Sequence, residues 1–355
     1  MMGEILFCRG GEYAQNQLFC LQNEILNRDN TLRPFYELKK SLGKKGFEAN
    51  TVDMTKNFKD ADAYIFFDIP KKQIDKRYYE MAKKTEKKEI YLILYEPPAT
   101  RPDNYDRRLH ENFRRIMTWN DDFIDGTKYI KGNFATPYME GEKIEIPHVD
   151  FDSRKMMCMV TANKYSAHPD QLYTARTDAA KWMEKNHPQE FDLYGQRWEL
   201  PVFHSDFLER AGVNNLSKAM HKFKVRLPNK TFYKSNFGPI KNKKEVMQKY
   251  KFCICYENQR DVPGYVSEKI FDAFFSGCVP IYLGANNIEK YVPKKCFIDM
   301  RDFDEFEQVH ANISKMERNE FEERVCCIED FLNSKKCAQF KINHFVSQFE
   351  KMVGI

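Results

Sequence analysis

The chain has 355 residues, 42% of them hydrophobic, so it can bury a core large enough for two domains and is neither disordered nor fibrous. Its 57 basic and 52 acidic side chains leave a formal net charge of only +5, and its lysine clusters are typical of solvated helix faces. This balance argues against a nucleic-acid partner, and we expect none.

The first 150 residues alternate apolar, β-rich runs with amphipathic segments. The predicted elements are helices over 32–42 and 74–84 and strands over 61–69 and 90–95. Repetition of this alternation predicts a parallel sheet with helices on its faces. A polar, proline-containing stretch interrupts the pattern, and we end this first domain, 1–150, there.

The alternation restarts in a second domain, 151–330. Its predicted elements are strands over 156–161, 191–194, 251–256 and 279–283 and helices over 172–184 and 267–276. Helical periodicity continues beyond Asp304, so 331–355 is predicted as a C-terminal helical tail.

The predicted fold class is therefore α/β, with two Rossmann-like domains facing each other across a cleft. Ligands bind beyond the carboxyl ends of parallel strands, so such a cleft suits a nucleotide sugar and its acceptor. The sequence has no Gly-x-Gly-x-x-Gly loop and no Walker phosphate loop, which argues against dinucleotide oxidoreductases and P-loop enzymes.

The most informative motif spans residues 250–284, which read YKFCICYENQRDVPGYVSEKIFDAFFSGCVPIYLG. Along its whole length it resembles the nucleotide-binding signature of the α-1,3-fucosyltransferase family, with Ser267 where Thr is more usual. The likeness continues in MVTANK (159–164), FDLYGQRW (191–198) and FGPIK (237–241), and more weakly in LYEPP (94–98). The chain thus resembles a soluble, bacterial- or viral-type member of this family, which implies a GT-B type fold.

The resemblance implies a glycosyltransferase of glycan biosynthesis and protein glycosylation. It would move L-fucose from GDP-fucose to an oligosaccharide hydroxyl, α-1,3 to GlcNAc or Glc, inverting the anomeric centre in a single displacement. LacNAc-type, chitobiose-core and other glycans remain open as acceptors, and acceptor specificity is expected in the N-terminal half and in 199–234. The alternatives are a same-fold transferase of another nucleotide sugar and a catalytically silent sugar-nucleotide-binding protein.

Two expected donor-binding residues follow from chemistry as well as from the resemblance. Glu268 and Lys269 fall in the first turn of the 267–276 helix, where free backbone N–H groups and the helix dipole favour a pyrophosphate. Lys269 adds a positive charge beside the phosphates. Glu268 is better aimed at ribose or fucose hydroxyls, from which a carboxylate can accept hydrogen bonds.

The other expected donor ligands depend on the resemblance. Arg176 lies where the family carries an arginine that binds the diphosphate, although its residue type alone favours an ordinary surface position on a helix. Tyr265 matches a tyrosine that lines the family's pocket, Asn258 matches the Asn of its Glu-Asn pair, and Asn163 lies in its Ser-Asn turn.

Glu96 is the expected catalytic residue. It ends an apolar strand and precedes Pro97 and Pro98, which stop the strand and hold the carboxylate at the carboxyl end of the sheet. A glutamate in that position is often an ordinary loop residue. Its resemblance to the family's catalytic glutamate makes it the expected general base.

No metal site and no required cofactor is expected, although divalent ions could stimulate turnover. Asp302 and Asp304 make an Asp-x-Asp, but they lie where the helical tail begins, with Asp304 at a helix start. Asp121 and Asp122 are typical of a turn, and the eight histidines form no constellation that the sequence reveals.

The ten cysteines follow no disulfide framework and indicate unpaired thiols of a reducing compartment. Residues 1–8 carry no secretion signal, and no stretch approaches the length of a membrane span. We therefore expect a soluble cytoplasmic protein, of open oligomeric state.

Overall fold

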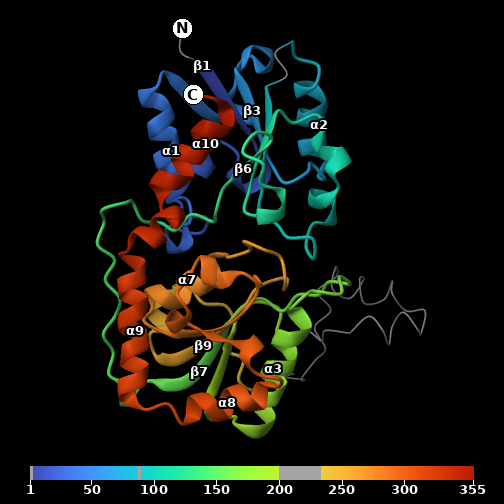
Figure 1. The fold of residues 1–355 in the computed structure, drawn as a ribbon. Helices are drawn as coiled ribbons and strands as arrows, with labels where there is room; N and C mark the ends of the chain where they lie inside the picture. The colour runs from blue at the N-terminus through green and yellow to red at the C-terminus, as the bar shows by residue number, and fades with distance from the viewer. Residues whose placement is uncertain (1–2, 87–88, 200–232) are drawn as a thin grey trace, which may run out of the picture. The chain divides into compact units, whose positions relative to one another are not determined.

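The computed structural model describes residues 3–86, 89–199 and 233–355. The chain divides into two compact units. Unit 1 comprises Met1–Lys143, Val262–Glu268 and Ser334–Ile355, and unit 2 comprises Ile144–Asp261 and Lys269–Asn333. Each unit is built around one parallel sheet with helices (Figure 1).

The sheet of unit 1 has six parallel strands in the order β2-β1-β3-β4-β5-β6. The strands are β1 (Gly3–Cys8), β2 (Phe47–Thr51), β3 (Ala63–Phe67), β4 (Ile90–Leu94), β5 (Arg115–Thr118) and β6 (Tyr129–Lys131). Successive side chains of β1 enter opposite cores, with Ile5 and Phe7 in one and Leu6 and Cys8 in the other. The strand order reverses between β1 and β3, which makes their carboxyl ends a topological switch point.

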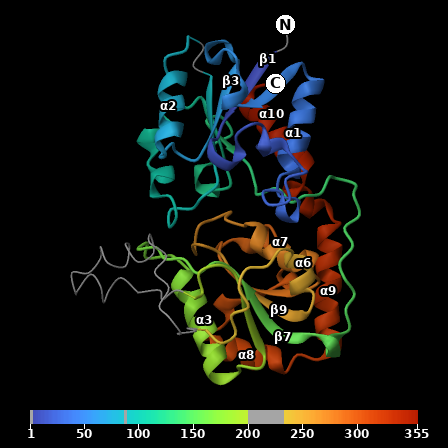
Figure 2. The ribbon, with the colours of Figure 1, turned by 180° about the vertical axis from the view of Figure 1, so that it is seen from behind.

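Helices from both ends of the chain cover one face of this sheet. The helices α1 (Arg33–Lys44) and α10 (Ile342–Val353) lie side by side there in both views (Figures 1 and 2). Phe35 of α1 meets Phe345 of α10 edge-on, with ring centroids 5.4 Å apart, and Phe349 stacks on Phe7 at 5.6 Å. On the other face the ring of Tyr79, from α2 (Gln73–Ala82), packs against Phe66.

The predicted helical tail 331–355 is therefore not a separate element. Its helix α10 buries an apolar stripe, which consists of Ile342, Phe345, Phe349 and Met352, in the core of unit 1. It ends at Gly354, whose φ of +82° is a left-handed conformation that glycine adopts without steric cost. Periodicity in the sequence predicted the helix but not its partner, because an apolar stripe does not specify which surface covers it.

The domain boundaries 1–150 and 151–330 also differ from the two units. Unit 2 begins at Ile144 and ends at Asn333, and Val262–Glu268, predicted inside the second domain, groups with unit 1. The reason is packing: Tyr265 and Val262 share an apolar cluster with Trp119.

The sheet of unit 2 has five parallel strands in the order β11-β10-β9-β7-β8. The strands are β7 (Lys155–Val160), β8 (Phe191–Tyr194), β9 (Tyr250–Tyr256), β10 (Val279–Leu283) and β11 (Ile298–Asp299), and the helices are α3 (Tyr173–Asn186), α6 (Lys243–Met247), α7 (Glu268–Phe275), α8 (Phe306–Ser314) and α9 (Arg318–Leu332). The strand order reverses between β7 and β9, so the switch point of this unit lies at their carboxyl ends. The two-domain α/β fold class predicted from the sequence is confirmed.

All ten cysteines are free thiols, and most lie in the cores. Across the described residues, the helices are all too short or too polar to cross a membrane.

Candidate functional site

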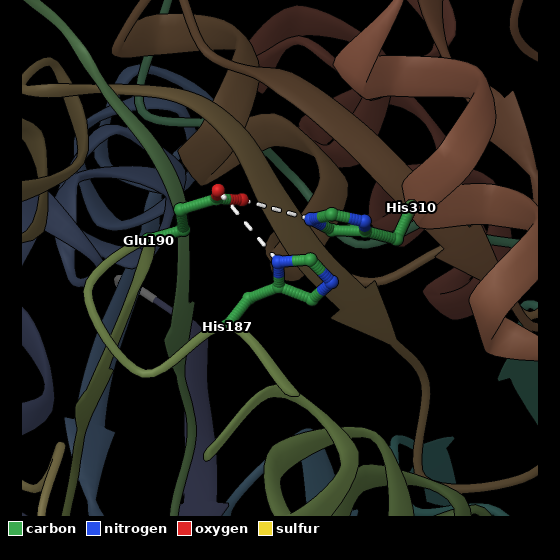
Figure 3. A group of neighbouring side chains, drawn as sticks. All are labelled: His187, Glu190 and His310. Carbon is green, nitrogen blue, oxygen red and sulfur yellow. Dashed lines mark hydrogen bonds and ion pairs between the residues drawn. The ribbon is translucent and has the colours of Figure 1, made fainter. Parts of the chain in front are cut away.

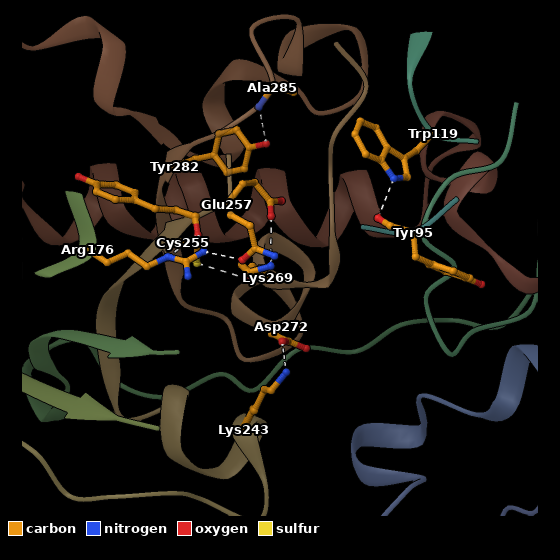
Figure 4. A network of polar contacts seen from close by, with 12 residues as sticks. Tyr95, Trp119, Arg176, Lys243, Cys255, Glu257, Lys269, Asp272, Tyr282 and Ala285 are labelled. Carbon is orange, nitrogen blue, oxygen red and sulfur yellow. Dashed lines mark hydrogen bonds and ion pairs between the residues drawn. The ribbon is translucent and has the colours of Figure 1, made fainter. Parts of the chain in front are cut away.

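Arg176 of α3 binds the carboxyl end of β9. Its Nε and Nη2 donate to the carbonyl oxygen of Tyr256 at 3.1 and 2.6 Å, and Nη2 also donates to Asn258 Oδ1 at 3.0 Å (Figure 4). Only 3% of Arg176 is exposed, so it is not the surface arginine that residue type alone favoured. Arg176 and Asn258, both predicted at the donor site, therefore meet at the switch point of unit 2.

Lys269 of α7 faces a buried carboxylate that sequence reasoning missed. Its Nζ lies 3.2 Å from Oε2 of Glu257, the residue that follows β9, and the Glu257 side chain is 0% exposed (Figure 4). A buried charge is costly unless it is paired, so Lys269 stabilises this carboxylate. Burial, and then the charge of Glu257, raise the pKa of Tyr282 well above its ordinary value. The signal that identified Glu96, a carboxylate at the end of a buried strand, also applied to Glu257.

The remaining predicted donor ligands occupy three different settings. Glu268 is exposed as the first residue of α7. Tyr265 is 2% exposed and packs its ring on Trp119, with centroids 4.5 Å apart. Asn163, just beyond β7, is 2% exposed, and its Nδ2 donates to the Arg197 carbonyl at 3.1 Å. Asn163 thus lies near the unit 2 switch point, whereas Tyr265 serves the packing of unit 1.

Glu96 lies at the carboxyl end of β4, as its apolar run and the prolines after it predicted. Two polar side chains fix its backbone. Asp68 Oδ1 accepts from the Glu96 N–H at 3.2 Å, and Asn104 Nδ2 donates to the Glu96 carbonyl at 3.1 Å. Asn104 also donates to Asp68 Oδ1 at 2.7 Å, which links the two supports. Asp68 and Asn104 therefore fix the backbone of the half-buried Glu96.

His110 supports Asn104 from inside unit 1. The ring is 1% exposed, with Nε2 3.0 Å from the Asn104 carbonyl oxygen and Nδ1 3.0 Å from the Tyr129 hydroxyl. A carbonyl oxygen only accepts, so Nε2 carries a proton, and in the neutral ring Nδ1 accepts from the Tyr129 hydroxyl. Burial lowers the pKa of His110. The positive charges of Lys128 and Arg107 lower it too, whereas the hydrogen bond with Asn104 and the charge of Asp106 oppose this shift.

We expect the melting temperature to fall as the pH drops below about 6.5, the ordinary pKa of histidine. Because the pKa of His110 is lower in the folded state, the unfolded chain takes up the proton first. The contribution of the neutral His110 ring to the free energy of unfolding is fully present above the pKa that this ring has in the unfolded chain. It is lost as the pH falls through the pKa of the ring in the folded protein. Thermal melts of His110→Gln, which keeps a donor towards Asn104 without titrating, should show a flatter pH profile.

His344→Gln is the matched control for this experiment, because burial also lowers the pKa of His344, a half-buried ring of unit 1 that lies on α10. The two variants separate the contribution of each ring. An unchanged acid slope in His110→Gln would contradict the role given to His110.

One member of each acidic pair forms an ion pair with a lysine. Asp121 lies in a one-turn helix and pairs with Lys131 at 2.7 Å, and Asp302 pairs with Lys294 at 2.8 Å. The helix start predicted at Asp304 is wrong by one residue. Glu305 precedes the first turn of α8, and the Asp304 N–H instead donates to Gln308 Oε1 at 2.8 Å.

Comparison with known proteins finds a family resemblance within the second half of the chain. Residues 204–324 match the family model "Glycosyltransferase family 10 (fucosyltransferase) C-term". Over this stretch the chain is similar to the C-terminal part of family 10 glycosyltransferases. Part of the family 10 match, and nearly all of the 199–234 stretch where acceptor specificity was expected, lie outside the described residues.

Short stretches of this chain also align with curated fucosyltransferases. Over 69 residues it is 44% identical to the alpha-(1,3)-fucosyltransferase FucT of Helicobacter pylori, which covers 19% of this chain and 14% of that protein. Over 70 residues it is 40% identical to an alpha-(1,4)-fucosyltransferase of Arabidopsis thaliana, which covers 20% of this chain and 17% of that protein. The chain thus spans less than a fifth of the length of these two relatives.

Solved structures extend the likeness to the whole fold. An alpha1,3-fucosyltransferase crystal structure matches with a TM-score of 0.57 at 15% identity, covering 99% of this chain and 90% of that one. The structure of alpha1,3-fucosyltransferase with GDP-fucose matches with a TM-score of 0.54 at 16% identity and the same coverage. Anabaena Alr3699/HepE in complex with UDP-glucose matches with a TM-score of 0.52 at 11% identity over 100% of both chains. At these identities the likeness shows the GT-B fold alone.

Proposed function

We propose that this protein transfers L-fucose from GDP-fucose to an oligosaccharide hydroxyl, forming an α-1,3 linkage to GlcNAc or Glc. The observation that carries the proposal is the family 10 match over 204–324, which contains the 250–284 signature. The fucosyltransferase relatives include α-1,3 and α-1,4 enzymes, so the linkage depends on the resemblance of the signature to the α-1,3 group.

The donor diphosphate would lie at the first turn of α7. There the N–H groups of the first turn and the dipole of the helix attract negative charge, and Lys269 contributes a cation. The exposed Glu268 in the same turn would accept hydrogen bonds from sugar hydroxyls. Arg176 would hold Asn258 towards the nucleotide through the hydrogen bond from its Nη2 to Asn258 Oδ1.

The proposed reaction is one in-line displacement with inversion. A bond forms between the acceptor oxygen and the fucose anomeric carbon while the bond from that carbon to the phosphate oxygen breaks. Glu96 takes the acceptor proton, and GDP leaves with its charge stabilised by Lys269 and the α7 N-terminus. An inverting route needs no carboxylate nucleophile of the kind that a retaining glycosidase uses.

The test is release of GDP or UDP from the purified full chain. GDP-fucose, GDP-mannose and UDP-sugars are each offered with a panel that includes LacNAc-type and chitobiose-core oligosaccharides. We expect GDP-fucose to be consumed fastest, with release that depends on the acceptor. A preference for a UDP-sugar would instead indicate a same-fold transferase with another donor. GDP binding without turnover on any acceptor would indicate a silent binding protein.

We also expect turnover to survive removal of divalent ions, because Lys269 and the α7 N-terminus supply the positive charge that the leaving diphosphate requires. The measurement compares initial rates before and after exhaustive chelation, well below the melting temperature. Modest stimulation by added magnesium or manganese is compatible with this view. Loss of all turnover, with recovery by one specific ion only, would show that the diphosphate site depends on a metal.

A further inference from the structure

Two histidines and a glutamate meet just before β8, on the edge of the unit 2 sheet opposite to the carboxyl ends (Figure 3). His187 follows α3, and its N–H donates to the Met183 carbonyl at 2.7 Å. The Glu190 N–H donates back to the His187 carbonyl at 3.0 Å, so a tight turn fixes these two residues relative to each other. His310 comes from α8 and lies 120 residues further along the chain.

The ligand atoms of the three side chains converge. One nitrogen or oxygen from each lies within 4.8 Å of the others. Glu190 Oε2 is 2.8 Å from His310 Nε2, and its Oε1 is 3.7 Å from His187 Nδ1, so both rings direct a nitrogen at one carboxylate (Figure 3). The two rings stack with centroids 3.7 Å apart, and Trp182 flanks both.

The cluster lies at the surface of unit 2, with one side chain buried and two partly exposed. The His310 side chain is 8% exposed, whereas those of His187 and Glu190 are 33% and 40% exposed. An ion could therefore enter from solvent and keep a water molecule on the exposed side.

We propose that His187, Glu190 and His310 bind a divalent transition metal, with Zn²⁺ as the preferred ion. Imidazole nitrogen and carboxylate oxygen are ligands that zinc takes at about 2.0 to 2.2 Å, and three protein ligands with one water complete a tetrahedral set. Binding exchanges the contacts between Glu190 and the two rings for bonds to the metal. Small rotations of the rings bring both lone pairs onto the ion.

The ion would join the end of α3, the turn before β8 and the helix α8. The ion would lie at the amino end of β8, whereas Lys269 and Asn258 lie at the opposite edge of the same sheet, where the carboxyl ends of the strands are. The ion would therefore stabilise unit 2 and take no part in the transfer of fucose. The proposal thus goes beyond the proposed function and does not depend on it. No pattern in the sequence predicts this site, because His310 is far from Glu190 along the chain.

The test titrates the full chain, freed of metal by chelation, with ZnCl₂ in a calorimeter. We expect one saturable equivalent per chain and a melting temperature several degrees higher in excess ZnCl₂, because an ion that binds only the folded state stabilises it. His187→Asn and His310→Asn should each lose the saturable binding and the rise in melting temperature. GDP affinity should be the same with and without ZnCl₂.

His148→Asn is the matched control. His148 also faces a glutamate, with Nε2 3.7 Å from Glu329 Oε2, but its side chain is 74% exposed and belongs to no group of three ligands in the described residues. This variant should bind ZnCl₂ like the original chain. If the histidine variants fold poorly, Glu190→Gln removes the charged ligand at nearly constant shape and should also lose the binding. No saturable equivalent in the original chain, or equal binding in all the site variants, would overturn the proposal.

Discussion

Glu96→Gln is expected to lose most of the transferase activity while keeping GDP affinity near that of the original chain. Glutamine is close to isosteric with glutamate but cannot take the acceptor proton. Removing a general base lowers a rate by about a hundred- to ten-thousand-fold. The measurement is the initial rate of GDP release at saturating acceptor, with calorimetry of GDP binding beside it.

The structure makes this substitution a clean test. Asp68 and Asn104 hold the main chain of residue 96, which the substitution leaves unchanged, so the melting temperature should move little. Glu89→Gln is the matched control, because Glu89 precedes the same strand, β4, at its amino end. It should retain full turnover. Near-normal turnover in Glu96→Gln would exclude Glu96 as the base and direct the search to other carboxylates of unit 1.

Lys269→Ala is expected to weaken GDP binding and also to lower the melting temperature. Loss of one charge-assisted contact to a phosphate costs about 1.5 to 3 kcal/mol, or roughly ten- to a hundredfold in affinity. The melting temperature should fall because Lys269 lies 3.2 Å from the fully buried carboxylate of Glu257, and removing one partner of a buried ion pair is destabilising.

The double variant Lys269→Ala/Glu257→Gln separates the two effects. Without the carboxylate there is no buried charge for Lys269 to compensate, so the melting temperature should return towards the original value while GDP affinity stays low. Lys243→Ala is the matched control, because Lys243 pairs with Asp272 of α7 at 2.6 Å (Figure 4). It should leave GDP affinity intact. GDP affinity that is unaltered in Lys269→Ala would contradict the donor-site assignment.

The sequence by itself determined most elements of this fold. Apolar runs with turn residues at their ends predicted β8 and β10 with the bounds that the structure has, and helical periodicity predicted α3 and α7 to within two residues. The same local signals placed Glu96 after β4 and Lys269 in the first turn of α7. These features are local, because side-chain periodicity and turn chemistry act over a few neighbouring residues.

Only the tertiary structure decided which groups meet. It paired Lys269 with Glu257, buried Arg176 against the Tyr256 carbonyl 80 residues away, and set α10 in the core of unit 1. It also brought His310 to Glu190. An amphipathic pattern shows that a face is buried but not against what, and the charge of a side chain does not identify its partner. Such partners follow from the order of strands in the two sheets and from the helices that pack on them, which no short stretch of sequence contains.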